Sequence, residues 1–439
     1  MALASDLAAA LVARRERIVS TMGDGVMLLA AAPERVRSAD VHYPYRQNSD
    51  FAYVTGLLES EAACVLAPGA KEPYALFVRP HDPERAIWVG ARAGLDGATG
   101  QYGADVAHPI ADLERELPRW LRQAEQVWLD LGRDDPLANR LLAAVRAAQA
   151  ERPRSGTGPT AIRDAGEILH ELRLVKQPDE LVLLREAIGI ACEAHRIAMQ
   201  TTQPGMAEYE IEALVDYTFR RRGAAGPAYP SIVAGGANAT VLHYTDNGAR
   251  LQGDQLLLLD AGDEFAGYCA DVTRTFPVGR TYGSAQRDLY DAVLSAQCAA
   301  IDAARPGATL EALHATAVRV LADALVQLGL LEGPVDAAVE QETYKQFYMH
   351  RTSHWLGRDV HDVGVYRQGD APRPLAPGMV FTVEPGLYVA DTDDVPAAFR
   401  GIGIRIEDDV LVTATGSEVL SADAPKNPIE IETLRASAA

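Results

Sequence analysis

Short apolar runs alternate with helical patterns over about the first 150 residues of the chain. Apolar runs of about four to eight residues between turn residues are typical of strands. Here they are GVMLLAAA, SDFAYVTGL, ACVLAPG, YALFVRP and QVWLDLG, at residues 25–32, 49–57, 63–69, 74–80 and 126–132. Helical spacing of apolar residues occurs near the N-terminus, at 111–125 and at 136–149. This alternation predicts an α/β N-terminal domain with a partly parallel sheet.

The pattern changes after a segment rich in Pro, Gly, Ser and Thr, ERPRSGTGPTAIRD at residues 151–164. Such segments are typical of domain boundaries, and we expect the boundary region here. We therefore place one domain at residues 1–170 and a second at 171–439.

The second half predicts longer helices followed by strands. Helices are expected at 177–200, 207–223, 284–304 and 309–329. The runs MVFTVEPGLYV and GIRIEDDVLVT, at 379–389 and 403–413, predict strands. Helices packed on one side of antiparallel strands give an α+β domain.

Composition excludes some classes of function. The formal net charge of -20 argues against nucleic-acid binding, because attraction to phosphates needs a basic face. The four cysteines show no C-x-x-C spacing, which argues against a structural zinc site or a disulfide framework. Free thiols suit a reducing cytosol.

The first residues, MALASDLAAALVARRERIV, do not have the order of a secretory signal, because the basic residues follow the apolar run and Asp6 interrupts it. They predict an amphipathic helix. No segment approaches the roughly 18–20 uninterrupted apolar residues of a membrane span. We expect a cytoplasmic protein without a membrane partner.

Two aspartates stand at the ends of apolar runs in LLLLDAGDEFAGYCADVTRTF, residues 256–276. Asp260 closes the run of leucines, and GDEFAGY after it predicts a hairpin that returns Asp271 to the same neighbourhood. Burying two carboxylates together is costly unless a cation is present. The alternative is ordinary turn chemistry, in which Asp caps a loop.

A histidine cluster and two glutamates change the balance between these alternatives. MHRTSHWLGRDVHDVG contains His350, His354 and His361, among only ten histidines in the chain. Glu384 and Glu407 each interrupt a strand-like run, where glutamate is disfavoured. Surface positions would explain either glutamate alone, but they explain both poorly beside two aspartates and the histidine cluster.

Asp260, Asp271, His354, Glu384 and Glu407 together provide four carboxylates and one imidazole. Two divalent ions would balance the four negative charges. Ligands rich in oxygen favour Mn²⁺, Mg²⁺ or Co²⁺. Two ions about 3.5–4 Å apart are a known arrangement for hydrolysis.

This set resembles that of the pita-bread metallopeptidases, and within them the bacterial Xaa-Pro aminopeptidases (aminopeptidase P). The similar segments follow one another in order over nearly the whole chain. They are YRQNSDFAYVTGL, HELRLVKQPDEL, SIVAGGANATVLHY, LDAGDEFAGYCADVTRTF, SHWLG, VEPGLY and GIRIEDDVLVT. One departure is the residue pair around the histidine, where Ser353 and Trp355 stand and many relatives have a glycine. That departure bears on the shape of the pocket, because all five ligand types remain.

The resemblance implies two metal ions, most simply Mn²⁺. Asp260 and Asp271 would hold one ion, and Asp271 and Glu407 would bridge to the second. His354 and Glu384 would complete the coordination of the second ion. A hydroxide between the metals would be the nucleophile, with Glu384 also acting as general base.

It also implies further catalytic and substrate-binding residues. His243 and His361 would steady the substrate carbonyl or the tetrahedral intermediate. Arg405 would act beside them, and His350 and Tyr388 would lie on the substrate side, with Tyr388 tuning Glu384. Trp88, in AIWVG, matches a position where the family lends an aromatic residue from a neighbouring subunit. A core or edge-strand tryptophan is the alternative for this residue.

The implied activity is removal of the N-terminal residue from peptides with proline in second position, by a homo-oligomer such as a dimer or tetramer. A prolidase, which cuts Xaa-Pro dipeptides, uses the same five ligands and stays open as an alternative. A metal-free creatinase-like enzyme or a non-catalytic binding protein would not need the ligand set. A methionine aminopeptidase would lack the N-terminal domain.

Overall fold

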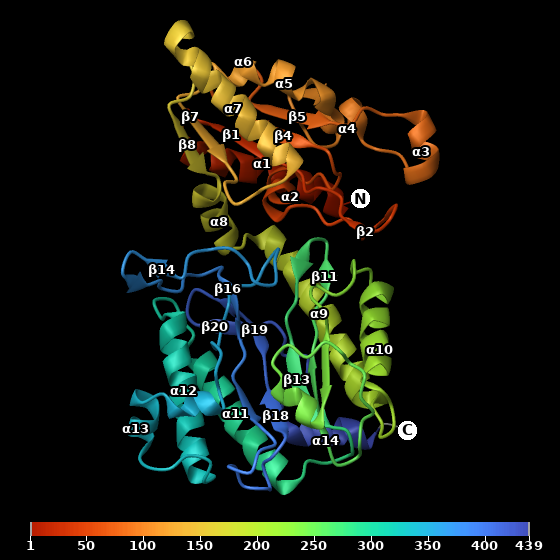
Figure 1. Cartoon of the computed structure of the whole chain (residues 1–439), viewed down its shortest axis with the longest axis vertical. Helices are drawn as coiled ribbons and strands as arrows, with labels where there is room; N and C mark the ends of the chain where they lie inside the picture. Colours follow the sequence, from red (N-terminus) through yellow and green to blue (C-terminus); the bar gives the residue numbers. More distant parts are fainter. Residues whose placement is uncertain (1, 438–439) are drawn as a thin grey trace. The chain divides into compact units, whose positions relative to one another are not determined.

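The chain folds into two compact units, which divide between Leu172 and Arg173. The computed structural model describes residues 2–437. Figure 1 labels the helices and strands of both units. Each unit has its own sheets and its own buried clusters, so each is described by itself.

The first unit is built on one six-stranded sheet with the order β6-β5-β4-β1-β7-β8. The strands are β1 Val26–Ala30, β4 Ala63–Leu66, β5 Tyr74–Val78, β6 Val106–Pro109, β7 Gln126–Leu129 and β8 Ala161–Asp164. The pairs β1–β7, β5–β6 and β7–β8 are parallel, whereas β1–β4 and β4–β5 are antiparallel. The prediction of a partly parallel sheet is confirmed.

Successive residues of the central strand enter two different cores. In β1, Met27 and Leu29 pack into one buried cluster, whereas Val26 and Leu28 pack into another. Successive side chains of a strand point to opposite faces, so helices must cover the sheet on both sides. The unbroken apolar run GVMLLAAA therefore belongs to a doubly covered α/β sheet.

The remaining elements of the first unit are mostly helical. They are α1 Ala2–Met22, α2 Ser49–Thr55, α3 Pro83–Val89, α4 Gly94–Gly100, α5 Leu113–Glu116, α6 Pro118–Leu121, α7 Pro136–Ser155, α8 Gly166–Leu174, the 3₁₀ turn η1 Ile110–Asp112, and the hairpin β2 Val36–Ser38 with β3 Val41–His42. Helix α8 begins in the first unit and ends just past the division.

One strand prediction is wrong, because residues 49–57 form helix α2. The side chain of Asn48 caps this helix by accepting a hydrogen bond from the backbone N–H of Phe51 at 2.8 Å. Gly56 ends it in the left-handed conformation. All seven helical residues are buried, so the polar face that marks a surface helix is missing from the sequence.

The segment expected to hold the domain boundary lies inside the first unit. Residues 151–155 end α7, and residues 161–164 form β8, which pairs parallel with β7. The Gly and Pro residues between them make the connection from the helix to this edge strand.

The second unit has three main groups of antiparallel strands. The first is the sheet β13-β10-β9, formed by Thr273–Pro277, Leu256–Asp260 and Ile232–Gly235. The others are β16-β19-β20, formed by Val380–Val383, Asp408–Val412 and Ser417–Val419, and β17-β18, formed by Gly386–Val389 and Ile402–Arg405. Short hairpins add β11 Glu264–Phe265 with β12 Tyr268–Cys269, and β14 Arg367–Gln368 with β15 Ala371–Pro372.

Paired helices flank these strands, and Figure 1 shows the α9–α10 pair and the α11–α12 pair on opposite sides of them. The helices are α9 Pro178–Thr201, α10 Glu208–Arg221, α11 Ser284–Ala303, α12 Leu310–Gln327, α13 Val335–Glu340 and α14 Pro428–Ala436, with 3₁₀ turns η2 Gly236–Thr240 and η3 Thr343–Gln346. The four long helices and the antiparallel strands confirm the predicted α+β class, whereas the helix pairs do not lie on one side of the strands as expected. No helix among residues 2–437 is long and apolar enough to cross a membrane.

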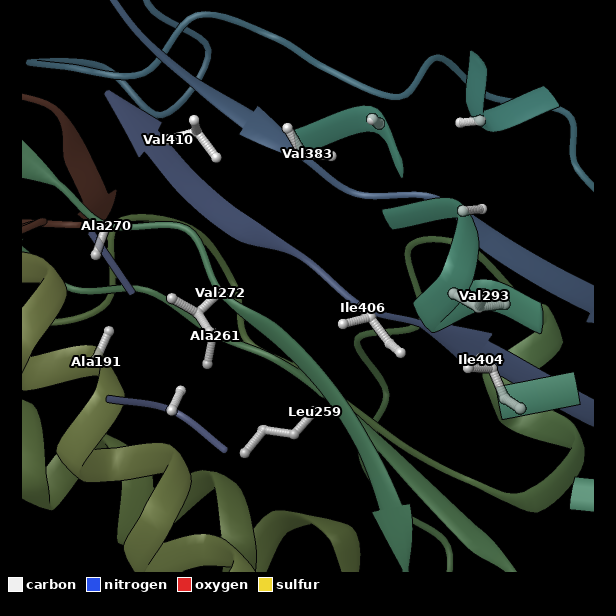
Figure 2. Close-up of a cluster of buried hydrophobic side chains, with 14 of the residues drawn as sticks. Ala191, Leu259, Ala261, Ala270, Val272, Val293, Val383, Ile404, Ile406 and Val410 are labelled. Carbon is white, nitrogen blue, oxygen red and sulfur yellow. The ribbon is translucent and has the colours of Figure 1, made fainter. Parts of the chain in front are cut away.

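Alternation along the strands separates the apolar core from a polar face. Figure 2 shows Leu259, Ala261, Val272 and Ile406 in one buried cluster with Ala191 of α9. The intervening residues on the same chain segments include the acidic residues that the sequence singled out. Since the side-chain period of a strand is two, a core on one side places those acids together on the other side.

Asp263, in the connection between β10 and β11, is fully buried. Neither of its carboxylate oxygens has a hydrogen-bond partner among the described residues. Burial raises the pKa of this carboxyl from 3.8 to about 8. Between these two pKa values the folded protein keeps a proton that the unfolded chain releases. The free energy of unfolding therefore falls as the pH rises from the lower value to the higher one.

We expect Asp263→Asn to remove this pH-dependent loss of stability. The variant gains about 1–3 kcal/mol relative to the wild type between pH 5 and pH 8, because the amide does not ionise. Urea unfolding at the two pH values measures the effect. Asp288→Asn, at an exposed position, is the matched control. Parallel stability curves for the wild type and Asp263→Asn would contradict the assignment.

Candidate metal centre

The hairpin of β10 and β13 brings Asp260 and Asp271 together. Asp260 ends β10 opposite Thr273, two residues after Asp271. The hydroxyl of Tyr229 lies 2.7 Å from Oδ1 of Asp260 and 2.6 Å from Oδ1 of Asp271. The predicted hairpin and the proximity of the two aspartates are therefore present.

Glu384 and Glu407 come from a second hairpin and face each other across it. The register pairs Val383 with Asp408 and Gly386 with Arg405, which places Glu384 opposite Glu407. Both glutamates lie where the regular ladder is interrupted, between β16 and β17 on one strand and between β18 and β19 on the other. Like charges directly opposite each other destabilise a sheet, so this pairing needs a compensating charge.

The segment that precedes β16 supplies His354 beside these acids. Its backbone carbonyl accepts from the N–H of Thr382 at 2.9 Å, which ties it to the strand that leads to Glu384. Nε2 of His354 lies 3.2 Å from Oδ2 of Asp271 and 3.6 Å from Oε1 of Glu384. Nδ1 lies 3.0 Å from the carbonyl of Trp355. Donation from Nδ1 to that carbonyl leaves Nε2 as the coordinating nitrogen.

The donor atoms converge closely enough for a cation. One ligand atom each from Asp271, His354 and Glu407 lies within 4.8 Å of the others. Asp260 and Glu384 reach the same place through the contacts above. Carboxylate oxygens with one imidazole form a donor set that suits a hard or borderline divalent ion. The residues present therefore fit the metal that the sequence predicts.

Without a cation, burial and mutual repulsion raise the pKa values of the acidic side chains. Burial, together with the neighbouring Asp271 carboxylate, raises the pKa of Glu384 to about 7. Burial raises the pKa of Glu407 well above its usual value, and Asp271 adds to the effect. Burial also raises the pKa of Asp260, although Arg405 opposes it. Bound cations would favour the ionised carboxylates and reverse these shifts.

The neighbouring carboxylates raise the pKa of His354. Burial by itself lowers that pKa, but the hydrogen bond to Asp271 and the carboxylate of Glu384 outweigh it and raise the value to about 9. The imidazole thus serves as a local counter-charge for the acids. A metal ion would take over that role.

A hydrogen-bonded chain runs from Asp260 to His350. Nη2 of Arg405 donates to Oδ2 of Asp260 at 2.6 Å, and Nη1 donates to the hydroxyl of Tyr388 at 3.0 Å. That hydroxyl lies 2.8 Å from Nε2 of His350. Nδ1 of His350 is 3.7 Å from Oε2 of Glu384. Tyr388 is therefore linked to Glu384 through His350.

His243 and His361 line the same cavity, whose volume is about 480 Å³. The rings of His354 and His361 have centroids 4.3 Å apart in an edge-on arrangement. Burial lowers the pKa of His361, and His354 lowers it further. His243 is exposed at the cavity wall. The structure thus brings the second-unit residues that the sequence singled out to one cavity, except Tyr388, which lies behind its wall and bonds to His350 and Arg405.

The loop that holds His361 is anchored by a buried ion network. Asp362 is 2.5 Å from Nη2 of Arg173 and 3.0 Å from Nζ of Lys176. Its backbone N–H donates to the carbonyl of Trp355 at 2.9 Å. These bonds hold the loop against the segment that carries His354.

Sequence analysis missed two polar neighbours of the acids, Tyr229 and Thr273. The hydroxyl of Thr273 donates to Oε2 of Glu407 at 2.6 Å. The sequence could have indicated Thr273, because this residue lies two positions after Asp271 and so on the same face of the strand. Tyr229 precedes β9 and has no periodic signal, so only the fold reveals its bridging contact.

Trp88 belongs to the first unit and lies in helix α3. It is 87% exposed, and α3 has no buried residue. The alternative of a core or edge-strand tryptophan is therefore wrong. The side chain of Asp82 caps α3 by accepting hydrogen bonds from the backbone N–H groups of Glu84 and Arg85. The side chain is available for a contact outside its own unit.

Comparison with known proteins extends these findings. The profile of metallopeptidase family M24 matches residues 182–414, and that of the aminopeptidase P N-terminal domain matches residues 11–128. The chain is 43% identical to the Xaa-Pro aminopeptidase of Escherichia coli, over 97% of each chain. It is 41% identical to the Xaa-Pro aminopeptidase of Haemophilus influenzae, over 96% of each.

Solved structures give the same result. The aminopeptidase PepP of Pseudomonas aeruginosa aligns with a TM-score of 0.96 and 44% identity, over 98% of each chain. The aminopeptidase P of E. coli with the inhibitor Pro-Leu aligns with a TM-score of 0.94 and 41% identity, over 98% of each. The agreement covers both units.

We expect Mn²⁺ to stabilise metal-stripped protein through these acids. At about 100 times the dissociation constant, a bound ion adds about 2.7 kcal/mol to the free energy of unfolding. Glu407→Gln removes a central donor charge and should sharply reduce the rise in melting temperature. Calorimetry with and without Mn²⁺ measures it, with the exposed Glu332→Gln as control. An equal rise in Glu407→Gln and wild type would contradict a metal site at Glu407.

Proposed function

Since this chain belongs to metallopeptidase family M24, we propose that it is an Xaa-Pro aminopeptidase. It removes the N-terminal residue from peptides whose second residue is proline. The observation that carries the proposal is the convergence of Asp271, His354 and Glu407 in one cavity of a chain that matches Xaa-Pro aminopeptidases over its full length. The same full-length similarity favours the aminopeptidase over a prolidase.

We propose a centre of two divalent ions, with Mn²⁺ as the physiological metal. Asp260 and Asp271 hold one ion, Asp271 and Glu407 reach both, and His354 with Glu384 complete the second. The oxygen-rich donor set supports this choice. When bound, the ions supply Lewis-acid polarisation of the scissile carbonyl and lower the pKa of water.

Glu384 acts as the general base and takes the proton of the attacking water. Burial raises the pKa of this carboxyl in the protein without metal, and a bound cation would lower it again. The ionised carboxylate would then be available to accept a proton. Thr382 donates to Oε1 of Glu384 at 3.4 Å, and the other oxygen lies toward His350.

His243 and His361 stabilise the charge that develops on the carbonyl oxygen. Both line the cavity with the metal donors. Arg405 favours the ionised form of Asp260 and bonds to Tyr388, which in turn positions His350. His350 lines the space for the substrate, and Tyr388 lies behind it and bonds to it.

The cavity suits proline on the leaving-group side. Its wall includes the apolar side chains of Pro230, Ile232, Leu242 and Val360. The bond before proline has no N–H, so an enzyme that recognises it by shape and by carbonyl polarisation does not need that donor. The acidic donors also leave a region of negative charge for the free N-terminal amine of the substrate.

We propose that Trp88 completes a neighbouring subunit's site in a homo-oligomer, either a dimer or a tetramer. Its exposure, with that of Ile87 and Val89 in the same helix, supports a contact surface. We also propose that the enzyme works in the cytoplasm. All four cysteines are free thiols, which suits a reducing compartment.

We expect Glu384→Ala to lower kcat at least about 100-fold, because it removes the general base and a metal donor together. Cleavage of Arg-Pro-Pro and of Ala-Pro by metal-stripped protein, with and without Mn²⁺, is followed by mass. Mn²⁺-dependent loss of arginine from the tripeptide supports the aminopeptidase. Near-wild-type turnover in Glu384→Ala would overturn the assignment, and Glu332→Ala is the control.

The pattern of cleavage separates the alternatives. Cleavage of the dipeptide alone would make the protein a prolidase. Cleavage of neither peptide, with metal retained after dialysis, would point to a non-catalytic binding protein.

A further inference from the structure

Two arginines line the cavity of the metal centre, and they differ in their surroundings. Arg405 is 4% exposed and fully engaged, with bonds to Asp260, Tyr388 and Thr273. Arg351 lies at the mouth of the cavity and is exposed. Within residues 2–437, its guanidinium has neither a hydrogen bond nor an ion pair.

The backbone around Arg351 is held on both sides. Its carbonyl lies 2.8 Å from Nδ1 of His350. The next residue, Thr352, is buried, and its hydroxyl lies 2.8 Å from Nδ1 of His314 and 2.6 Å from the hydroxyl of Tyr348. A fixed backbone thus presents an uncommitted cation at the edge of the site.

Arg351 is not needed to balance the negative charge of the metal donors. Arg405 already performs that task, with Nη2 2.6 Å from Oδ2 of Asp260 in a buried position. An exposed guanidinium contributes little to buried charges, because water and salt screen it. The five N–H donors of Arg351 are therefore free for a ligand that enters the cavity.

We propose that Arg351 binds a carboxylate of the peptide on the leaving-group side, a role that rests on the proposed aminopeptidase function. The planar guanidinium matches a carboxylate through two parallel hydrogen bonds. The buried acids would hold the scissile bond, and Arg351 lines the same cavity at an exposed position. Proline and one further residue span about 7 Å when extended, so we infer that the C-terminus of a tripeptide extends from the acids toward Arg351.

Two sources supply such a carboxylate. One is the free C-terminus of a tripeptide, and the other is an acidic side chain at the residue after proline. Both present the same group to Arg351. The first makes the enzyme prefer very short peptides, whereas the second makes it prefer a particular sequence in longer ones.

The test compares three peptides with the Mn²⁺-loaded enzyme: Ala-Pro-Leu, its C-terminal amide, and the amide of Ala-Pro-Asp. For the wild type we expect KM to be about fivefold lower for a peptide with a carboxylate than for the Leu amide, the upper range for an exposed ion pair. The values of kcat should agree within about twofold, because this contact is equally strong in substrate and transition state.

Arg351→Gln should reduce that KM ratio to about 1. Arg351→Lys should retain part of it, because lysine keeps the charge but loses the planar fork. Arg305→Gln, at an exposed position outside the cavity, should keep the wild-type ratio. In 0.5 M salt the wild-type ratio should fall, since the contact is open to solvent.

The outcomes separate the proposals. A preference for the free acid alone, lost in Arg351→Gln, supports binding of the C-terminus. A preference for the Asp amide supports binding of an acidic side chain. Equal KM values in the wild type, or an unchanged ratio in Arg351→Gln, would overturn the role of Arg351. No cleavage of any peptide by the wild type would overturn the aminopeptidase function itself.

Discussion

The concentration of negative charge in one buried cavity is the constraint on which the second unit depends. Asp260, Asp271 and Glu407 are each less than one-tenth exposed, and the pKa values of Asp260, Glu384 and Glu407 are raised. Such a cluster is costly unless cations balance it. Arg405 and His354 balance part of it in the protein itself, and a bound metal would complete the balance.

The strand pattern makes this concentration possible without breaking the core. Leu259, Val272 and Ile406 lie on the apolar face, so their neighbours point to the opposite face. The tripeptide Glu407, Asp408 and Asp409 shows the same alternation. Asp408 points away from the cavity and pairs with buried Arg274 at 2.7 Å. Burial opposes the ionisation of Asp408, but Arg274 and Lys426 hold its pKa below the usual value.

Function then follows from the division between buried and exposed charge. In the proposed function, the buried acids and one imidazole would hold the metal and provide the general base. The chain of Arg405, Tyr388 and His350 fixes one wall, and apolar residues form another. At the exposed edge of the cavity the local charge is positive, because Arg351 has no ion-pair partner among residues 2–437. A peptide bound as proposed would therefore place its leaving-group side near the positive charge of Arg351.

The sequence by itself determined the fold class, the long helices of the second unit and the candidate donors, because these depend on local periodicity and on acids in apolar runs. Other features depend on the tertiary structure. Helix Ser49–Thr55 is buried on all sides, so the sequence lacks the polar face that would have identified it. The pairing of Glu384 with Glu407, the bridge from Tyr229 and the uncommitted state of Arg351 depend on residues that meet only in the folded chain. Periodicity reports which face a residue occupies, whereas partners across a cavity are set by long-range packing.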